Sequence, residues 1–464
     1  MNYNLLDEHW IPVLYCDGTW ERVGIRQALE DADRIRQIAA NNPMDRLAIL
    51  RFLLALLYWC KGDPPDEGNT NSVASLSSEW FFRLDENRDC FNLVGDAGRF
   101  YQDRTAQRTR AVTDLIQEIP TGNNFWHFRH ATDKIDGLCP ACCVLGLLRL
   151  PLFSVSGLPD LKAGVNGTPP VYVVPWGMSL RETLQANWSP CANLGTPAWV
   201  QPDVRPTPSE DVPLLTGLTL LSRRVFLHDP VERPGVCIGC GTRGTPLILT
   251  CEYQTAGRQE NALWSDPHAV YSDATPRRTV KAADLTAAGK FRMDRPWPDL
   301  LARLVETDRF GSKKTVASLF IVGFATDQAK NIDAWEWTIA VPPGTSIKET
   351  LASLLRQWWK EGWRMEKRIG RSEVEGSATI AAIRPDIEGR VSAQAGELIV
   401  GADEVWQQAA AEYRPLMKVI ARSLSPGFTA AAIHRRQQIA LASPDMRPKV
   451  ESAKKPGRKK GEHK

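Results

Sequence analysis

Two pairs of cysteines carry the strongest chemical signal in the sequence. Cys139 and Cys142 enclose Pro-Ala, and Cys237 and Cys240 enclose Ile-Gly. The C-x-x-C spacing places two thiolates on one turn, at the separation that a tetrahedral zinc ion needs. Four thiolates fill the coordination sphere and leave no position for water, so we expect a structural zinc and not a catalytic one.

The distance between the two pairs along the chain leaves other interpretations open. Residues 143–236 separate them, whereas the halves of a local zinc ribbon are usually ~15–20 residues apart. The four thiols could instead be buried core groups or a redox pair. Cys143 and Cys251 are the nearest substitutes if one of the four is not a ligand. A bound zinc would fix loops from distant parts of the chain.

The rest of the sequence offers little to support catalysis. His228-Asp229 and Asp266-Pro267-His268 could form metal or acid-base pairs, but neither has the H-E-x-x-H spacing of a metalloprotease helix. The phosphate-binding motif G-x-x-x-x-G-K-[ST] and the nucleophile motif G-x-S-x-G do not occur. We therefore expect a protein that is not an enzyme.

One aromatic stretch has a composition suited to nucleic acid. Residues 123–130, NNFWHFRH, interleave aromatic side chains with amides, His and Arg. Such side chains can stack on bases and bind phosphates. An equally good interpretation is a loop that Phe125 and Trp126 anchor in the core.

Two further loops could contact nucleic acid. Residues 156–168 are glycine-rich and include Lys162, so their backbone could approach a sugar-phosphate groove closely. Residues 325–330 form a polar tip after an apolar stretch, which is typical of a hairpin that projects from a sheet. Taken alone, each is also compatible with an ordinary surface turn.

The hydrophobic pattern predicts the elements that position these residues. Residues 4–13 alternate apolar and polar side chains before a turn at Asp17-Gly18, and residues 19–23 resume the pattern, which indicates a hairpin. Residues 45–60 are apolar nearly all round, which is typical of a helix at the centre of a core. A short helix is expected over residues 25–31, and strands over residues 171–174 and 318–324.

A boundary between two domains is expected at Pro342-Pro343-Gly344, because this sequence extends neither a helix nor a central strand. The predicted fold class is α+β: a large mixed domain over residues 1–342, whose loops the zinc pins, and a C-terminal four-helix bundle over residues 346–446. Ser346 and Glu349 form a capping box that would start the bundle.

Composition and charge exclude a disordered protein and limit how the protein could bind nucleic acid. Hydrophobic residues make up 43% and charged residues 24% of 464 residues, with 16 Trp, which excludes a disordered chain. Residues 447–464 hold eight Lys or Arg and two Glu, so we expect a disordered basic tail. The rest of the chain then carries a net charge of −3, which argues against extensive coating of nucleic acid and allows a local contact.

The sequence also predicts where the protein acts. Residues 47–59 are apolar but short of the ~20 residues that cross a bilayer, and Arg51 interrupts them. No basic start followed by an apolar signal core opens the sequence. We expect a cytoplasmic protein without a membrane partner, whose ten Cys are thiols or metal ligands.

Together these features resemble the CasA family, the large subunit of the type I-E CRISPR surveillance complex Cascade. The resemblance rests on the opening NLLDEHWIPV, the CPAC that follows NNFWHFRHATD, the run LKAGVNGTPPVYVV with LRET after it, the CIGC, and the helical C-terminal region, in this order. It covers nearly the whole chain.

The resemblance implies a function in antiviral defence. A protein of this kind recognises the protospacer-adjacent motif (PAM) in target double-stranded DNA, largely from the minor groove, and starts duplex opening and R-loop formation. Its implied partners are the 5′ handle of the guide RNA, the target DNA, the other Cascade subunits and the helicase-nuclease that it helps to recruit. It has no nuclease activity of its own.

The resemblance also assigns residues to these contacts. Leu158 and Pro159 depart from the run of glycines in the family's DNA-reading loop, and Arg258 stands where the family has a basic finger. The implied DNA-binding residues are Ser156, Gly157, Leu158, Pro159, Asp160, Lys162, Arg258, Asp327 and Gln328, with Gln328 as the wedge. The implied contacts to guide RNA and neighbouring subunits are Asn124, Phe125, Trp126, His127 and Arg129.

Two other functions are compatible with the cysteine pairs. A zinc-ribbon DNA-binding regulator would bind a specific duplex alone, without guide RNA. A zinc-dependent hydrolase would need an open coordination position and an acid or base with a shifted pKa.

Overall fold

The computed structural model describes most of the first 340 residues. The described residues are 2–64, 79–95, 100–117, 137–154, 165–203, 210–255, 263–271, 279–282, 318–327, 330–340, 430, 431 and 434. Two compact units divide the chain, the first comprising Met1–Arg295 and Asp308–Ser346, and the second Pro296–Thr307 and Ile347–Lys464. The predicted helical bundle, apart from residues 430, 431 and 434, and the predicted tail lie outside the described residues. The elements that position the candidate site all belong to the first unit.

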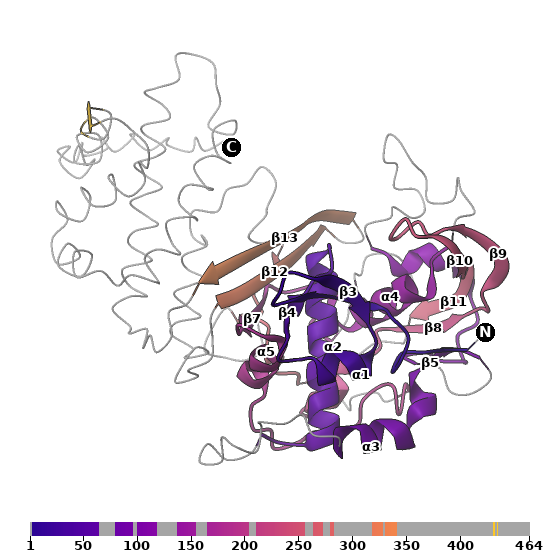
Figure 1. Ribbon diagram of the computed structural model, residues 1–464, viewed down its shortest axis with the longest axis horizontal. Helices are drawn as coiled ribbons and strands as arrows, with labels where there is room; N and C mark the ends of the chain where they lie inside the picture. The colour runs from indigo at the N-terminus through magenta and orange to yellow at the C-terminus, as the bar shows by residue number, and fades with distance from the viewer. Residues whose placement is uncertain are drawn as a thin grey trace, which may run out of the picture. The chain divides into compact units, whose positions relative to one another are not determined.

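A long buried helix, α2 (Pro43–Lys61), confirms the helix predicted over residues 45–60. It starts where the Asn42 side chain accepts a hydrogen bond from the Met44 amide at 2.8 Å, with Pro43 in the first turn. It ends at Gly62, whose φ of 73° favours glycine. Figure 1 shows α2 running through the middle of the described part of the chain.

The N-terminal sheet contains the predicted hairpin. Strands β2 (Ile11–Tyr15) and β3 (Trp20–Val23) pair antiparallel, and β4 (Ile35–Ile38) completes the order β3-β2-β4. The predicted short helix is α1 (Ile25–Glu30).

The prediction of one alternating strand over residues 4–13 is wrong at its start. Strand β1 (Tyr3–Asn4) instead pairs with β5 (Asn92–Val94), and a turn separates β1 from β2. Leu5 and Leu6 are consecutive and both fully buried, which a strand with one solvated face does not allow. Trp10 fixes the turn by donating its indole N–H to the Leu5 carbonyl at 3.1 Å.

The remaining elements mix short helices and strands, as an α+β domain was expected to do. They are α3 (Glu79–Glu86), a 3-10 turn at Arg88–Phe91, β6 (Thr109–Ala111), a 3-10 turn at Val112–Leu115, α4 (Pro140–Phe153), β7 (Tyr172–Trp176), α5 (Leu180–Asn187), α6 (Leu214–Thr219), β8 (Arg223–Leu227), β9 (Val231–Val236), β10 (Arg243–Leu247), β11 (Thr250–Thr255), β12 (Ser318–Asp327) and β13 (Lys330–Ala340).

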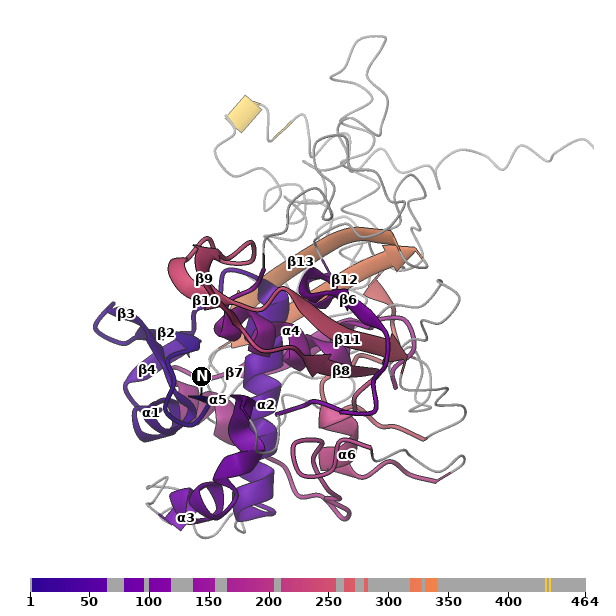
Figure 2. The same ribbon diagram turned by 90° about the vertical axis from the view of Figure 1, so that its right-hand side faces the viewer.

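These strands form further small sheets around α2. The orders are β6-β11-β8, β13-β12-β7 and β10-β9, and every pair is antiparallel. Figure 2 shows the β3-β2-β4 sheet on one side of α2 and the β6-β11-β8 sheet on the other. Strands β7 and β12 confirm the two strands predicted from short apolar runs, and β12 extends three residues further, to Asp327.

An aromatic cluster forms around Phe52 of α2. The Phe52 ring lies 6.0 Å from that of Trp10, 5.3 Å from Phe100 and 5.6 Å from Trp199, measured between centroids. Fully burying a side chain of this size contributes ~1.5–3 kcal/mol. Among the helices that the structure describes, none is long and apolar enough to cross a membrane.

Candidate metal centre

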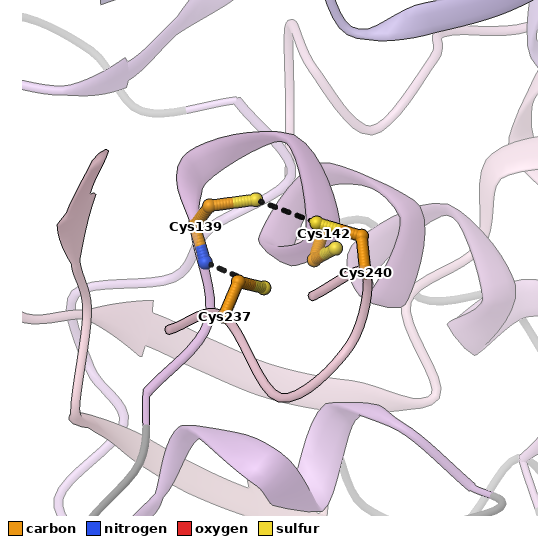
Figure 3. A group of neighbouring side chains, drawn as sticks. All are labelled: Cys139, Cys142, Cys237 and Cys240. Carbon is orange, nitrogen blue, oxygen red and sulfur yellow. Dashed lines mark hydrogen bonds between the residues drawn. The ribbon is translucent and has the colours of Figure 1, made fainter. Parts of the chain in front are cut away.

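The four predicted cysteine ligands come together in the structure. The sulfur atoms of Cys139, Cys142, Cys237 and Cys240 all lie within 4.8 Å of one another, and Figure 3 shows them pointing toward a common centre. The Sγ atoms of Cys139 and Cys240 are 3.7 Å apart. Sulfurs bound ~2.3 Å from a tetrahedral zinc are ~3.8 Å apart, so the spacing fits a metal of this kind.

The first pair lies at the start of a helix. Cys139 is the N-cap residue of α4 with an extended backbone, Pro140 occupies the first turn, and Cys142 follows in the same turn. The unpaired backbone N–H groups and the helix dipole favour negative charge at this end, which stabilises thiolates. Pro140 suits the position because its missing N–H has no partner to lose there.

The second pair lies on the turn between β9 and β10. The turn closes through hydrogen bonds from Gly241 N to Cys237 O at 2.8 Å and from Cys237 N to Thr242 O at 2.9 Å. Gly241 has a φ of 73°, which a residue with a side chain rarely adopts. A Cβ on Gly239 would lie 3.0 Å from the Cys142 sulfur, so a glycine lets the turn approach the first pair.

Hydrogen bonds join the two pairs directly. The Cys139 amide donates to the Cys237 sulfur at 3.2 Å, an interaction that stabilises a thiolate. Next to the cluster, Leu138 and Ile248 exchange backbone hydrogen bonds at 3.0 and 2.9 Å, and Ile238 N donates to Gly137 O at 3.1 Å. Backbone hydrogen bonds thus connect the two segments that carry the ligands.

The pKa values of the four thiols show that the cluster can hold a cation. Contacts with the Cys139 and Cys142 thiols lower the pKa of Cys237 to about 6 and hold the pKa of Cys240 far below its ordinary value. The contact with Cys139 conversely raises the pKa of Cys142. Four negative charges at this spacing repel one another, so full ionisation needs a bound cation.

The donor set and burial indicate which metal fits and what it can do. Four soft thiolates within 4.8 Å of one another suit zinc, and together they fill its coordination positions and leave none for a substrate. Cys139, Cys142 and Cys237 are buried, and Cys240 is at the surface. The arrangement is suited to structural metal binding.

The two substitute ligands lie outside the cluster. Cys143 and Cys251 are both fully buried, and the Cys143 thiol donates to the Leu138 carbonyl at 3.9 Å. Burial raises the pKa of Cys251 to about 12 and that of Cys143 well above its ordinary value. Both therefore stay protonated. Neither has to replace one of the four predicted ligands.

The two acid-base pairs considered from the sequence have structural partners instead. His228 contacts the Thr250 hydroxyl at 2.7 Å and the Glu252 carboxylate at 3.1 Å across the β8-β11 pair. Asp266 binds the Arg51 guanidinium of α2 at 2.6 Å, with both side chains buried. This ion pair was not predicted from the sequence. The one feature of the sequence that indicated it was Arg51, a charged residue inside an apolar helix.

Most of the residues assigned from the resemblance lie outside the described residues. Asp327 is described: it ends β12, where it pairs with Lys330 of β13. The residues outside the described ones are Asn124, Phe125, Trp126, His127, Arg129, Ser156, Gly157, Leu158, Pro159, Asp160, Lys162, Arg258 and Gln328.

Comparison with known proteins gives a consistent result. The model of the family "CRISPR-associated protein Cse1" matches residues 4–443. A curated protein of Thermus thermophilus, CRISPR-associated protein CasA/Cse1, is 28% identical over 390 residues, covering 74% of this chain and 71% of the relative.

Solved structures share the fold. The crystal structure of Thermus thermophilus CasA has a TM-score of 0.63 at 17% identity and covers 95% of this chain and 98% of that one. Cse1 from Acidimicrobium ferrooxidans has a TM-score of 0.58 at 16% identity, covering 95% and 94%. A chain of a structure described as a CRISPR RNA-guided surveillance complex has a TM-score of 0.63 at 16% identity, covering 95% and 100%.

Proposed function

The chain belongs to the family of CRISPR-associated protein Cse1, also called CasA, and we propose that it is the large subunit of an RNA-guided surveillance complex of the type I-E Cascade kind. The observation that carries this proposal is the family match over residues 4–443, which leaves only a few residues at the N-terminus and the basic end unmatched. The shared fold with a chain of a CRISPR RNA-guided surveillance complex supports it.

Within such a complex, the chain recognises the PAM beside a target in double-stranded DNA and starts to open the duplex. The DNA contacts fall to residues 156–160, Lys162, Arg258 and the wedge Gln328 with Asp327. The minor groove presents a degenerate pattern, so a close backbone, one cation and one inserted side chain suffice to read it and to unstack a step. The pairing of Asp327 with Lys330 supports a wedge at a hairpin tip.

The cysteine cluster serves this function as a structural zinc site. Cys139 follows the proposed RNA and subunit contacts at residues 124–127 and 129 closely in the sequence, and Cys240 lies on the β9-β10 turn. Zinc at this position would tie the chain that follows those contacts to the β9-β10 turn. The subunit itself binds and positions nucleic acid without catalysing a reaction, and it helps to recruit the helicase-nuclease.

Copurification tests the assignment to a complex. The tagged chain, coexpressed with a guide RNA and the other subunits of its complex, should copurify with both. The assembled complex should bind a duplex with the correct adjacent motif more tightly than one with a scrambled motif. Specific duplex binding by the isolated chain would favour a zinc-ribbon regulator, and metal-dependent turnover by the isolated chain would favour a hydrolase.

Two substitutions test the DNA-reading residues. Arg258→Gln should weaken capture of targets with the correct motif, whereas Arg243→Gln, which removes the same charge from an exposed position on β10, should not. Gln328→Ala should slow R-loop formation on an intact duplex with little loss of initial binding, and pre-opened targets should restore the rate. An equal defect on both targets, or on neither, would contradict the wedge.

A further inference from the structure

A buried polar network surrounds the ion pair of Arg51 and Asp266. The Arg51 Nη1 atom lies 2.6 Å from Asp266 Oδ1 and 3.4 Å from His268 Nδ1, and the guanidinium lies 5.5 Å from the centre of the Tyr172 ring. The side chains of Arg51 and Asp266 are 3% and 0% exposed. A carboxylate this deeply buried must be paired and hydrogen-bonded, so its partners are held in defined directions.

Asp266 uses its second oxygen to hold Asn166. The Asn166 amide donates to Asp266 Oδ2 at 2.8 Å and to the Tyr172 hydroxyl at 3.2 Å. Tyr172 in turn donates to the carbonyl of Leu152 at 3.1 Å, near the end of α4. Leu152 and Asn166 lie on either side of residues 155–164 in the sequence, so one chain of hydrogen bonds joins the residues that flank that stretch.

The same carboxylate also holds the chain just after a second stretch. Residues 256–262 are followed by Trp264, whose indole N–H donates to Asp266 Oδ2 at 3.3 Å. The backbone amides of Asp266 and His268 are fixed as well, by the Tyr271 hydroxyl at 2.6 Å and by Asp266 Oδ1 at 2.9 Å. Asn166 and Trp264, which follow residues 155–164 and 256–262 in the sequence, thus both donate to a single buried carboxylate.

Building on the function proposed above, we propose that the Arg51–Asp266 pair is a positioning centre for DNA recognition, with Asn166 as the positioning residue that links it to residues 155–164. These two stretches contain the assigned DNA-reading residues 156–160, Lys162 and Arg258. Arg51 fixes Asp266, and Asp266 fixes the relative placement of Asn166 and Trp264, which follow the two stretches in the sequence. Neither Arg51 nor Asp266 needs to touch DNA for this role.

The ion pair keeps Asp266 charged, and this strengthens its hydrogen bond with Asn166. Burial alone would raise the pKa of the Asp266 carboxyl, but the Arg51 guanidinium, with His268 and Asn166, holds that pKa well below its usual range. Asp266 therefore stays ionised, and hydrogen bonds to a charged acceptor are stronger than those between neutral groups. Removing the Asn166 amide loses the link but leaves the ion pair intact.

The chain offers a matched control at the other end of the network. Asn187, the last residue of α5, contacts His268 Nε2 through its Oδ1 atom at 3.2 Å, and its amide donates to Pro175 O at 2.8 Å and Thr183 O at 2.7 Å. Asn166 and Asn187 are both half-buried and both make side-chain hydrogen bonds in this network. Asn187 adjoins neither stretch.

The test uses the assembled complex with its guide RNA, carrying the full-length chain as wild type, Asn166→Ala or Asn187→Ala. The measurement is the ratio of affinities for a duplex with the correct adjacent motif and one with a scrambled motif, at fixed salt concentration. We expect Asn166→Ala to reduce this ratio by about tenfold, equivalent to ~1.4 kcal/mol, and Asn187→Ala to leave it within about twofold. Both variants should assemble as the wild type does.

The outcomes separate the inference from the function on which it rests. A wild-type complex that does not discriminate between the duplexes would overturn the proposed function, and the inference with it. Discrimination by the wild type that Asn166→Ala leaves unchanged would overturn the inference alone. An equal loss in both variants would also overturn it, because a purely stabilising network predicts no difference between its two ends.

Discussion

The cysteine cluster and the Arg51–Asp266 network both join distant parts of the chain, but by different chemistry. Cys139 contacts Cys237 across 98 positions of sequence, and Arg51 contacts Asp266 across 215. The cysteine contacts leave a recognisable pattern in the sequence, because structural zinc sites typically take two ligands from one turn. An ion pair has no such requirement, since one residue from each segment is enough.

The two regions also differ in what holds them together. A tetrathiolate site gains its free energy from a metal, and apparent binding free energies of structural zinc are ~10–16 kcal/mol. The buried ion pair gains little net stability over an apolar pair, but losing one partner is strongly destabilising. The first region should therefore respond to chelators, and the second to pH and to single substitutions.

The largest effect should follow loss of a zinc ligand. Cys240→Ser should abolish binding of about one zinc per chain and lower the free energy of unfolding by more than about 5 kcal/mol, because metal binding contributes directly to folding. Metal analysis and thermal unfolding measure both quantities. Cys16→Ser, at an exposed free cysteine, is the control and should change neither. Wild-type protein prepared without chelator that contains no metal would contradict the prediction.

Breaking the ion pair should have the next largest effect. Arg51→Met leaves Asp266 as a buried charge without its guanidinium and should lower the free energy of unfolding by ~3–5 kcal/mol in denaturant titrations. The double variant Arg51→Met/Asp266→Asn removes the charge as well but keeps a side-chain oxygen for the hydrogen bonds that Asp266 accepts, so it should recover part of this loss. If the double variant is as unstable as the single one, the loss comes from the packing and hydrogen bonds of Arg51 and not from the unpaired charge of Asp266. Zinc content should stay unchanged in both.

The contribution of the Arg51–Asp266 pair to stability should depend on pH in the acid range. The folded-state pKa of Asp266 lies below the ~3.9 of an unfolded aspartate, so its contribution to stability is fully present above about pH 4 and is lost as the pH falls below it. Each unit of this difference contributes ~1.36 kcal/mol. Unfolding measured between pH 6 and pH 2 should show a steeper loss for the wild type than for the Arg51→Met/Asp266→Asn variant. Parallel curves would show that Asp266 does not titrate in this range.

The contrast between the two regions explains what the sequence could and could not predict. Helix α2 was predictable because an apolar run of its length has few alternatives, and β7 and β12 because short β-branched runs favour strands. The four cysteines were predictable as a group because each pair repeats the same spacing. The turn between β1 and β2 was missed because Leu5 and Leu6 are buried by tertiary packing that local alternation does not record.

The partner of Arg51 was not predictable from the sequence for a similar reason. A charge inside an apolar helix indicates that a partner exists, but no pattern identifies one 215 positions away. Asp266 and His268 were noticed for their chemistry and assigned to a possible acid-base pair, whereas in the fold Asp266 neutralises Arg51 and His268 contacts the same guanidinium. Such residues are interpretable only once the topology places them together.

The smallest effect should come from the cysteine beside the cluster that is not a ligand. Cys143 follows the ligand Cys142 directly and is fully buried, but its sulfur lies outside the group of four. Cys143→Ala should leave about one zinc per chain and lower the free energy of unfolding by only ~1–2 kcal/mol, the scale of a small cavity in a core. Cys142→Ala, one position earlier, removes the same atoms and should abolish zinc binding. If the two variants lose zinc equally, the C-x-x-C spacing does not determine which cysteines bind the metal. The cysteine cluster would then lack the local sequence pattern that distinguishes it from the Arg51–Asp266 network.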